Sequence, residues 1–263
     1  MKLKKLADLT PGEYSKVFLV ASGPSVNEFD LTKKACADFW AMNGSIYLFS
    51  DVSVKPDLYL CDDPNFALAK LDAIILALKL CKRVALSYEV IKAVLDQAED
   101  LLKGQTIYLL EKVNRINGVK QLSDRKFAWK VRKDKDLVSD YSLLKSRPNT
   151  WGFSKNLVKG YYSARTIPYV GLQIAYCLGY QCVFLVGVDL TNTHSRFYES
   201  GEEAQPSSLD EHYNRHIYPN FRLMSEKIMS DKFKVYNLSG NSRLPNSLIP
   251  KITNLQLLEL LDS

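Results

Sequence analysis

The sequence predicts an α/β protein of the Rossmann-like class, with a mainly parallel sheet, helices on both faces and an inserted lid-like segment. Short apolar runs, typical of buried strands, alternate along the chain with longer segments whose apolar residues recur every three or four positions, typical of helices. Strands that alternate with helices of ten or more residues build βαβ units, so we expect the strands to run parallel.

The strand-like runs are four to six residues long, and several end in a small polar turn. The first of them, VFLVA, is typical: it is apolar, rich in β-branched residues and followed at once by Ser-Gly-Pro-Ser. The seven runs that predict strands are residues 17–21, 38–42, 58–61, 83–87, 106–110, 182–187 and 234–238. Helical spacing is found over residues 66–80, 88–102, 166–178 and 252–261.

The composition is that of an ordinary globular protein. With 263 residues, 46% hydrophobic and 24% charged, the chain favours one domain spanning residues 1–263 and excludes a disordered or collagen-like chain. The longest apolar run, residues 73–78, is far shorter than the roughly 20 residues of a membrane span. Asp8 and Pro11 interrupt the segment where a signal peptide would be apolar, so we expect a cytoplasmic protein.

Two segments break the alternation of strands and helices. Residues 111–160 lack a clean period and are strongly basic: between Lys112 and Arg147 there are eleven Lys and Arg against four Asp, a local charge of +7. We interpret this segment as an insertion or lid. Residues 191–220 are polar and aromatic, and they predict a long loop that leads into a helix.

Three successive predicted strands end in small polar turns, at the edge where open α/β sheets bind ligands. Ser22, Gly23 and Ser25 follow the first strand and suit an anionic group, Asn43 follows the second, and Asp63 follows the third.

Each of these turns also has a structural interpretation. The residues of the first also suit a plain tight turn, and those of the second also suit an ordinary Asn-Gly turn. The pair Asp62 and Asp63 suggests a metal ion, but neighbours on a strand point to opposite faces, and Asp63 followed by Pro64 also suits a helix start. No two cysteines have C-x-x-C spacing, so zinc is not expected.

All three histidines, His194, His212 and His216, fall in the long polar segment. Histidine is the side chain best suited to proton transfer near neutral pH, so this clustering predicts a general base. His212 and His216 are four residues apart and would share a helix face, which also permits a metal pair or two solvated rings. Asp189, Arg196 and Tyr198 lie nearby, a mixture that suits an anionic sugar.

Short motifs are spread along the chain and are densest from Gly152 to Ser239. They are Gly23-Pro24-Ser25, Asn43-Gly44-Ser45, Gly152-Phe153, Gly160-Tyr161, Thr166-Ile167, residues 172–176, Gly187-Val188-Asp189-Leu190-Thr191, Ser195-Arg196-Phe197-Tyr198 and Tyr236-Asn237-Leu238-Ser239. In this order the motifs resemble those of the WaaZ-type lipopolysaccharide-core biosynthesis proteins, a family associated with adding 3-deoxy-manno-octulosonic acid (Kdo) to the inner core.

A more distant similarity is to the bacterial sialyltransferases that use CMP-sialic acid and have a compact Rossmann-like domain with a lid. Their Gly-Asn-Gly-Pro-Ser turn corresponds to residues 21–25, which lack the first Gly and the Asn. One of their two phosphate-stabilising tyrosines is replaced by Thr191, and the other falls near Tyr198. Their catalytic histidine falls at or next to His216.

The resemblance implies an inverting glycosyltransferase that needs no cofactor and no divalent metal and takes Kdo from CMP-Kdo. The expected catalytic residues are His216, with His212 as the alternative base, Tyr198, Asp189 and Arg196. The residues expected to bind the donor are Ser22, Gly23, Ser25, Asn43, Asp63, Thr166, Asn237, Ser239 and Gly240. There are two alternatives to this function. The enzyme could use another CMP-activated donor, or the chain could be a protein of the same fold that binds a nucleotide sugar without transferring it.

The implied acceptor is a lipid A-Kdo glycolipid of the lipopolysaccharide inner core. The basic segment with Trp129 and Trp151 then suits the inner face of the membrane, where we expect a peripheral protein. A solvated basic lid is the alternative. No RNP or KH signature supports nucleic-acid binding, and homo-oligomeric assembly is left open.

Overall fold

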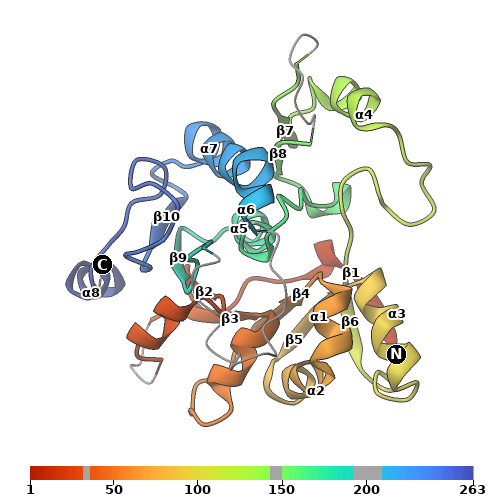
Figure 1. Ribbon diagram of the computed structural model, residues 1–263, viewed down its shortest axis with the longest axis horizontal. Coiled ribbons are helices and arrows are strands. Elements are labelled where there is room, and N and C mark those ends of the chain that lie inside the picture. Colours follow the sequence, from red (N-terminus) through yellow and green to blue (C-terminus); the bar gives the residue numbers. More distant parts are fainter. Residues whose placement is uncertain (32–35, 143–149, 192–208, 263) are drawn as a thin grey trace.

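The computed structural model describes residues 1–31, 36–142, 150–191 and 209–262, with only the backbone at 209 and 210. Its centre is an eight-stranded sheet in which every neighbouring pair is parallel, in the order β1-β6-β5-β4-β3-β2-β9-β10 (Figure 1). The strands are β1 Lys2–Lys5, β2 Lys16–Val20, β3 Asp38–Met42, β4 Leu58–Cys61, β5 Arg83–Ser87, β6 Thr106–Leu110, β9 Cys182–Val186 and β10 Lys234–Asn237. All seven predicted strands are confirmed, to within one residue at each end.

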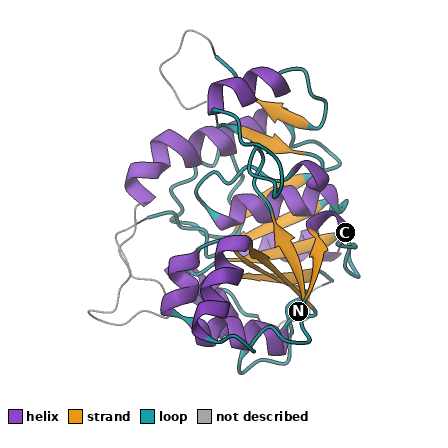
Figure 2. Ribbon diagram, turned by 90° about the vertical axis from the view of Figure 1, so that its right-hand side faces the viewer, coloured by secondary structure: helices purple, strands orange, loops and turns teal. Residues whose placement is uncertain are grey.

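Helices cover both faces of this sheet, as predicted (Figure 2). Alternate residues of β2 show the division: Val17 and Leu19 pack in one core cluster, while Phe18 and Val20 pack in the other. The first cluster includes α5 (Ile167–Cys177) and α7 (Tyr218–Lys227). The second includes α1 (Pro64–Ala69), α2 (Leu71–Leu80), α3 (Tyr88–Gln97) and α8 (Asn254–Asp262).

Three details of the prediction are wrong. The helix expected over residues 66–80 is two helices, because Lys70 leaves the helical conformation at φ −135° and ψ 59° while the apolar period continues across it. The helix expected to reach Leu102 ends at Gln97, and Leu102 is buried in the turns that return the chain to β6. Strand β1 was missed because it is basic and exposed, so its sequence carries no apolar run; it is held at the sheet edge by β6.

The basic insertion has regular structure of its own. It contains α4 (Asp124–Val131) and a two-stranded antiparallel sheet of β7 (Leu137–Ser139) and β8 (Gly152–Ser154), which stand beyond the main sheet in Figure 1. A buried hydrogen bond of 2.8 Å from the Gly152 backbone N–H to Asn220 Oδ1 ties this small sheet to α7. No helix among the described residues is both long and apolar enough to cross a bilayer.

The described part of the long polar segment after residue 208 is helical, as the prediction of a loop that leads into a helix indicated. A continuous helical stretch begins with α6 (Leu209–His212), passes through one π-helical turn at Tyr213–Ile217 and continues as α7. The two histidines of this stretch therefore lie at the π turn, a feature that is frequent at functional sites.

Candidate active site

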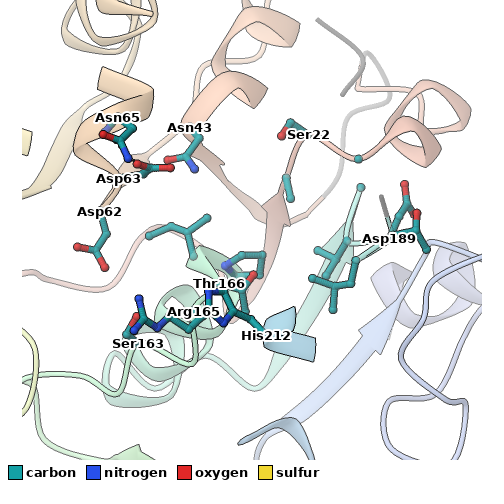
Figure 3. A pocket seen from close by; sticks show the side chains of 18 of the residues that line it. Ser22, Asn43, Asp62, Asp63, Asn65, Ser163, Arg165, Thr166, Asp189 and His212 are labelled. Carbon is teal, nitrogen blue, oxygen red and sulfur yellow. Dashed lines mark hydrogen bonds between the residues drawn. The ribbon is translucent and has the colours of Figure 1, made fainter. Parts of the chain in front are cut away.

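A pocket of about 510 Å³ opens along the carboxyl edge of the sheet (Figure 3). The strand order reverses at β2 and β9: from β2 the chain proceeds to β3, β4, β5 and β6 on one side, whereas β9 and β10 lie on the other. Ligands of open α/β sheets bind outside the carboxyl ends of the strands at such a point. The described residues that line the pocket are Ala21–Pro24, Asn43, Asp62–Asn65, Lys112, Ser163, Arg165–Pro168, Gly187–Thr191 and His212. Predicted site residues Ser22, Gly23, Asn43, Asp63, Thr166 and Asp189 are thus brought together.

At the β2 and β9 end of the pocket, the walls are two backbone turns in close contact. The Gly23 N–H donates to the Gly187 carbonyl over 2.9 Å. A Cβ atom on Gly23 would lie 2.5 Å from that same carbonyl, and one on Gly187 would lie 2.6 Å from the Ala21 carbonyl. Gly187 also has φ +67°, a left-handed conformation that favours glycine. Both positions therefore require glycine.

A chain of hydrogen bonds behind these turns joins the ends of β2, β9 and β10. Asp189 Oδ2 accepts from the Ser25 N–H over 2.9 Å, and the Ser25 hydroxyl donates to Ser239 Oγ over 2.8 Å. Ser239 Oγ also accepts from the Val188 N–H over 3.0 Å, and Asn237 Oδ1 accepts from the Ser239 N–H over 3.0 Å. The other oxygen of Asp189, Oδ1, is buried and has no hydrogen-bond partner among the described residues.

Four predicted donor-binding residues therefore lie outside the described pocket lining. Ser25, Asn237 and Ser239 hold the turns in place instead, while Gly240 is exposed and its carbonyl accepts from Lys251 Nζ over 2.8 Å. Direct contact of these four with a donor remains a prediction.

At the β4 end, the pocket walls are charged side chains. Asp63 Oδ1 caps α1 by accepting from the Asn65 N–H over 3.0 Å and the Phe66 N–H over 3.3 Å, as its helix-start pattern indicated. Asp62 Oδ1 forms an ion pair with Lys112 Nζ at 3.0 Å. Within the described part of the chain, no three His, Cys, Asp or Glu residues are grouped to hold a metal ion.

Backbone strain is concentrated around the pocket. Five described residues other than glycine have positive φ, and three of them line the pocket: Asn43 at 49°, Arg165 at 60° and Leu190 at 56°. A fourth, Ala164 at 46°, directly precedes Arg165. Such strain costs about 1–3 kcal/mol per residue and is enriched at functional sites. No local sequence pattern signalled the left-handed pair at 164–165.

His212, and not His216, is the described histidine that lines the pocket. The two rings contact edge to face with centroids 5.5 Å apart, so His216 lies directly behind His212. Burial, together with the charges of Arg165, the His212 ring and Arg215, lowers the pKa of His216 to about 4. His216 is therefore neutral at neutral pH. Arg196, Tyr198 and His194 lie outside the described residues.

Comparison with known proteins identifies the family. The family model of the 3-deoxy-D-manno-octulosonic acid transferase WaaZ matches residues 3–255. Probable 3-deoxy-manno-octulosonic acid transferases of Escherichia coli strain K12 and Salmonella typhimurium strain LT2 are 27% and 30% identical over 242 and 241 residues, which cover 90% of this chain in each case and 82% and 86% of the relatives.

Solved sialyltransferases of Campylobacter jejuni are also similar. The monofunctional α-2,3-sialyltransferase Cst-I is 14% identical with a TM-score of 0.48, over 94% of this chain and 84% of its own. CstII, solved with a substrate analogue and cytidine-5′-monophosphate, is 16% identical with a TM-score of 0.48, over 93% and 88%. The family match, which spans nearly the whole chain, places this protein in the WaaZ family of 3-deoxy-D-manno-octulosonic acid transferases, and it is a glycosyltransferase.

Proposed function

We propose that this glycosyltransferase moves Kdo from CMP-Kdo to the inner core of lipopolysaccharide, with inversion and without a divalent metal. The observation that carries the proposal is the family match over residues 3–255. The pocket supports it, because a cleft at the point where the strand order reverses suits a nucleotide-activated sugar.

The donor lies against the β2 and β9 turns, because residues 21–24 and 187–191 of these turns line the pocket. Arg165 and Thr166 line the same pocket and suit the Kdo carboxylate, since a guanidinium binds a carboxylate through two parallel hydrogen bonds. Tyr198 is proposed to complete the site at the phosphate, as the resemblance to the sialyltransferases implies, and Arg196 is a further candidate for binding the Kdo carboxylate.

Metal independence is supported by how the pocket carboxylates are used. Asp63 caps α1, Asp62 pairs with Lys112, and Asp189 accepts from a backbone N–H. A monophosphate leaving group develops a single negative charge as it departs, and hydrogen-bond donors can stabilise this charge without a divalent ion.

We assign the general base to His212, because it lines the pocket whereas His216 lies behind it. In this step an imidazole nitrogen of His212 takes the proton of an acceptor hydroxyl. The hydroxyl oxygen bonds to the anomeric carbon of Kdo as the bond from that carbon to the phosphate oxygen breaks, and CMP leaves with the electron pair. A single in-line displacement inverts the anomeric configuration.

The test is turnover by the purified chain with CMP-Kdo and a Kdo-containing inner-core acceptor, in buffer containing EDTA. We expect transfer of one Kdo, with inverted anomeric configuration by NMR. CMP-sialic acid and UDP-sugars are the comparison donors. Transfer from CMP-sialic acid alone would replace Kdo as the donor sugar, transfer only after magnesium is restored would refute metal independence, and no transfer from any donor would refute the proposal.

We also propose that the protein binds the inner-leaflet surface through the exposed face of α4. Arg125, Lys126, Trp129 and Lys130 fall on one side of this helix by their spacing, opposite the buried Ala128 and Val131, and the exposed Lys133 follows the end of the helix. The Trp129 side chain is 48% exposed, and Arg132 stacks on its ring at 3.5 Å. A basic face with an exposed indole fits an anionic bilayer.

Vesicle sedimentation tests this surface. We expect binding to vesicles with 30% phosphatidylglycerol but not to phosphatidylcholine, and the triple variant K126E/K130E/K133E should lose roughly 100-fold or more in affinity, since each basic residue contributes about 1 kcal/mol. Equal binding of the wild type and the variant would leave the basic face as a solvated surface.

A further inference from the structure

The pocket has two ends, one at β4 and one at the β2 and β9 turns, which lie on opposite sides of the site. Asp62 follows β4 and Asp189 follows β9, which are three strand spacings apart, or about 14 Å. In Figure 3 Asp62 and Ser163 lie at one side, Asp189 lies at the other, and His212 is between them. A base placed between two ends is where a donor and an acceptor would meet.

Lys112 sits at the end remote from the β2 and β9 turns. It is the second residue of the insertion, and its backbone is fixed because both ends of the insertion pair there: Val113 N–H donates to the Tyr161 carbonyl over 2.9 Å, and Tyr161 N–H donates to the Glu111 carbonyl over 3.0 Å. Gly160, at φ +83°, packs against this segment so closely that a Cβ atom would lie 2.6 Å from the Glu111 carbonyl. The backbone that carries the Lys112 side chain is therefore held in a fixed position.

The ion pair with Asp62 leaves Lys112 available to a ligand. The Lys112 side chain is 29% exposed and lines the pocket, whereas that of Asp62 is 12% exposed. Burial raises the pKa of Asp62, and the Lys112 ammonium opposes that rise. An ammonium has three N–H donors and one is sufficient for this pair, so donors remain for a second anion.

Cations are scarce in the pocket. Among its described lining residues, Lys112 and Arg165 are the two Lys or Arg side chains. If Arg165 binds the donor carboxylate, Lys112 is the remaining Lys or Arg of the described lining, at the end where Asp62, Asn65 and Ser163 offer partners for sugar hydroxyls.

We infer that Lys112, positioned by Asp62, binds an anionic oxygen group of the acceptor, which is a carboxylate or a phosphate. The end of the pocket where the insertion begins is then the acceptor subsite. This inference rests on the proposed function for the identity of the acceptor. It assigns the insertion a part in acceptor choice, because its second residue, Lys112, lines the pocket.

Steady-state kinetics with a water-soluble Kdo-containing core oligosaccharide tests the inference. We expect Lys112→Met to raise KM for the acceptor by roughly 10- to 100-fold, as expected for one charge-assisted hydrogen bond, with KM for CMP-Kdo changed less than twofold. Lys112→Arg should recover most of the loss. The double variant K112M/D62N, which leaves no unpaired buried carboxylate, should show the same acceptor defect as the single variant.

Modified acceptors show whether Lys112 binds a carboxylate or a phosphate. For the wild type, KM for the acceptor should rise when the recognised group is removed, by methyl esterification if it is a carboxylate or by dephosphorylation if it is a phosphate. On the acceptor that lacks the recognised group, Lys112→Met should have the same KM as the wild type. The matched control is Lys82→Met, which breaks an ion pair of 2.7 Å with the similarly buried Asp57 at the opposite edge of the sheet. It should leave both KM values unchanged.

Binding without turnover separates this inference from the proposed function. Calorimetry of the acceptor oligosaccharide alone should show weaker binding by Lys112→Met even if no donor supports turnover, in which case the proposed function fails and the acceptor subsite stands. Active wild type with unchanged acceptor KM in Lys112→Met, or a rise confined to KM for CMP-Kdo, would overturn the inference.

Discussion

The two ends of the pocket have different kinds of wall, formed by backbone turns at one end and by side chains at the other. At the β2 and β9 end, backbone turns approach so closely that Gly23 and Gly187 admit no side chain, and Ser239 ties three strand ends together. At the β4 end, the walls are side chains, of which Asp62 and Lys112 form an ion pair. The first end depends on the fold for its shape, and the second depends on individual charges. Substitutions should therefore reduce stability at the first end and substrate affinity at the second.

The largest expected effect falls between the two ends, at the proposed base. His212→Ala should lower kcat by about 10²- to 10⁴-fold, the usual contribution of a general base, whereas His216→Ala should lower it by less than about tenfold. Turnover of CMP-Kdo, with thermal unfolding as the control for folding, measures both. The reverse order of effects would return the catalytic role to His216, as the resemblance to the sialyltransferases implied.

The glycine turns should show the next largest effect. Gly187→Ala forces a side chain into a left-handed conformation and against the Ala21 carbonyl, and we expect a loss of about 2–4 kcal/mol in the free energy of unfolding. Gly179→Ala is the matched control, because Gly179 has φ +83° but nothing within 4 Å of a new Cβ atom; it should cost about 1 kcal/mol. Equal losses in urea unfolding would mean that the close approach of the two turns is unimportant.

Replacing one serine at each end of the pocket compares how the two ends contribute to stability. Ser239→Ala leaves the Val188 N–H and the Ser25 hydroxyl without their acceptor, so the free energy of unfolding should fall by about 2 kcal/mol. Ser163→Ala removes a hydroxyl that lines the pocket and makes no side-chain hydrogen bond among the described residues, so stability should change by less than about 0.5 kcal/mol. Similar losses for both variants would contradict the division of the pocket into two kinds of wall.

The smallest expected effect is the pH dependence that His216 contributes. Its pKa is about 4 in the folded protein and about 6.5 in the unfolded chain, so between these values the unfolded chain binds a proton that the folded protein does not. Stability therefore falls as the pH falls through this window, by about 1 kcal/mol because solvent screens the half-exposed ring. Urea unfolding at pH 7.5 and 5.0 should show a smaller loss for His216→Gln than for the wild type. Equal losses would mean that His216 titrates normally.

The strands were predictable because each carries its own signal. A run such as residues 182–186 is apolar along its whole length, as a strand buried on both faces must be, and this pattern is read without knowledge of its neighbours. Strand β1 was missed for the same physical reason: Lys2–Lys5 is an exposed edge strand, stabilised by the pairing with β6 and not by its own composition. Likewise, the break at Lys70 has no counterpart in the apolar period on either side of it.

The residues of the candidate site also fall into two groups, those that the sequence indicated and those that it did not. Residues that directly follow strands, such as Ser22, Asn43 and Asp63, could be found from the sequence, because parallel strands bring their carboxyl ends to one edge. Lys112 was interpreted only as part of a basic segment, and His216 was preferred to His212. Whether Lys112 meets Asp62, and which histidine faces the pocket, depends on contacts between segments far apart in the chain and on the π turn at Tyr213–Ile217. Local periodicity determines strands, helices and the edge at which a site forms, whereas only the packing of distant segments decides which side chains complete that site.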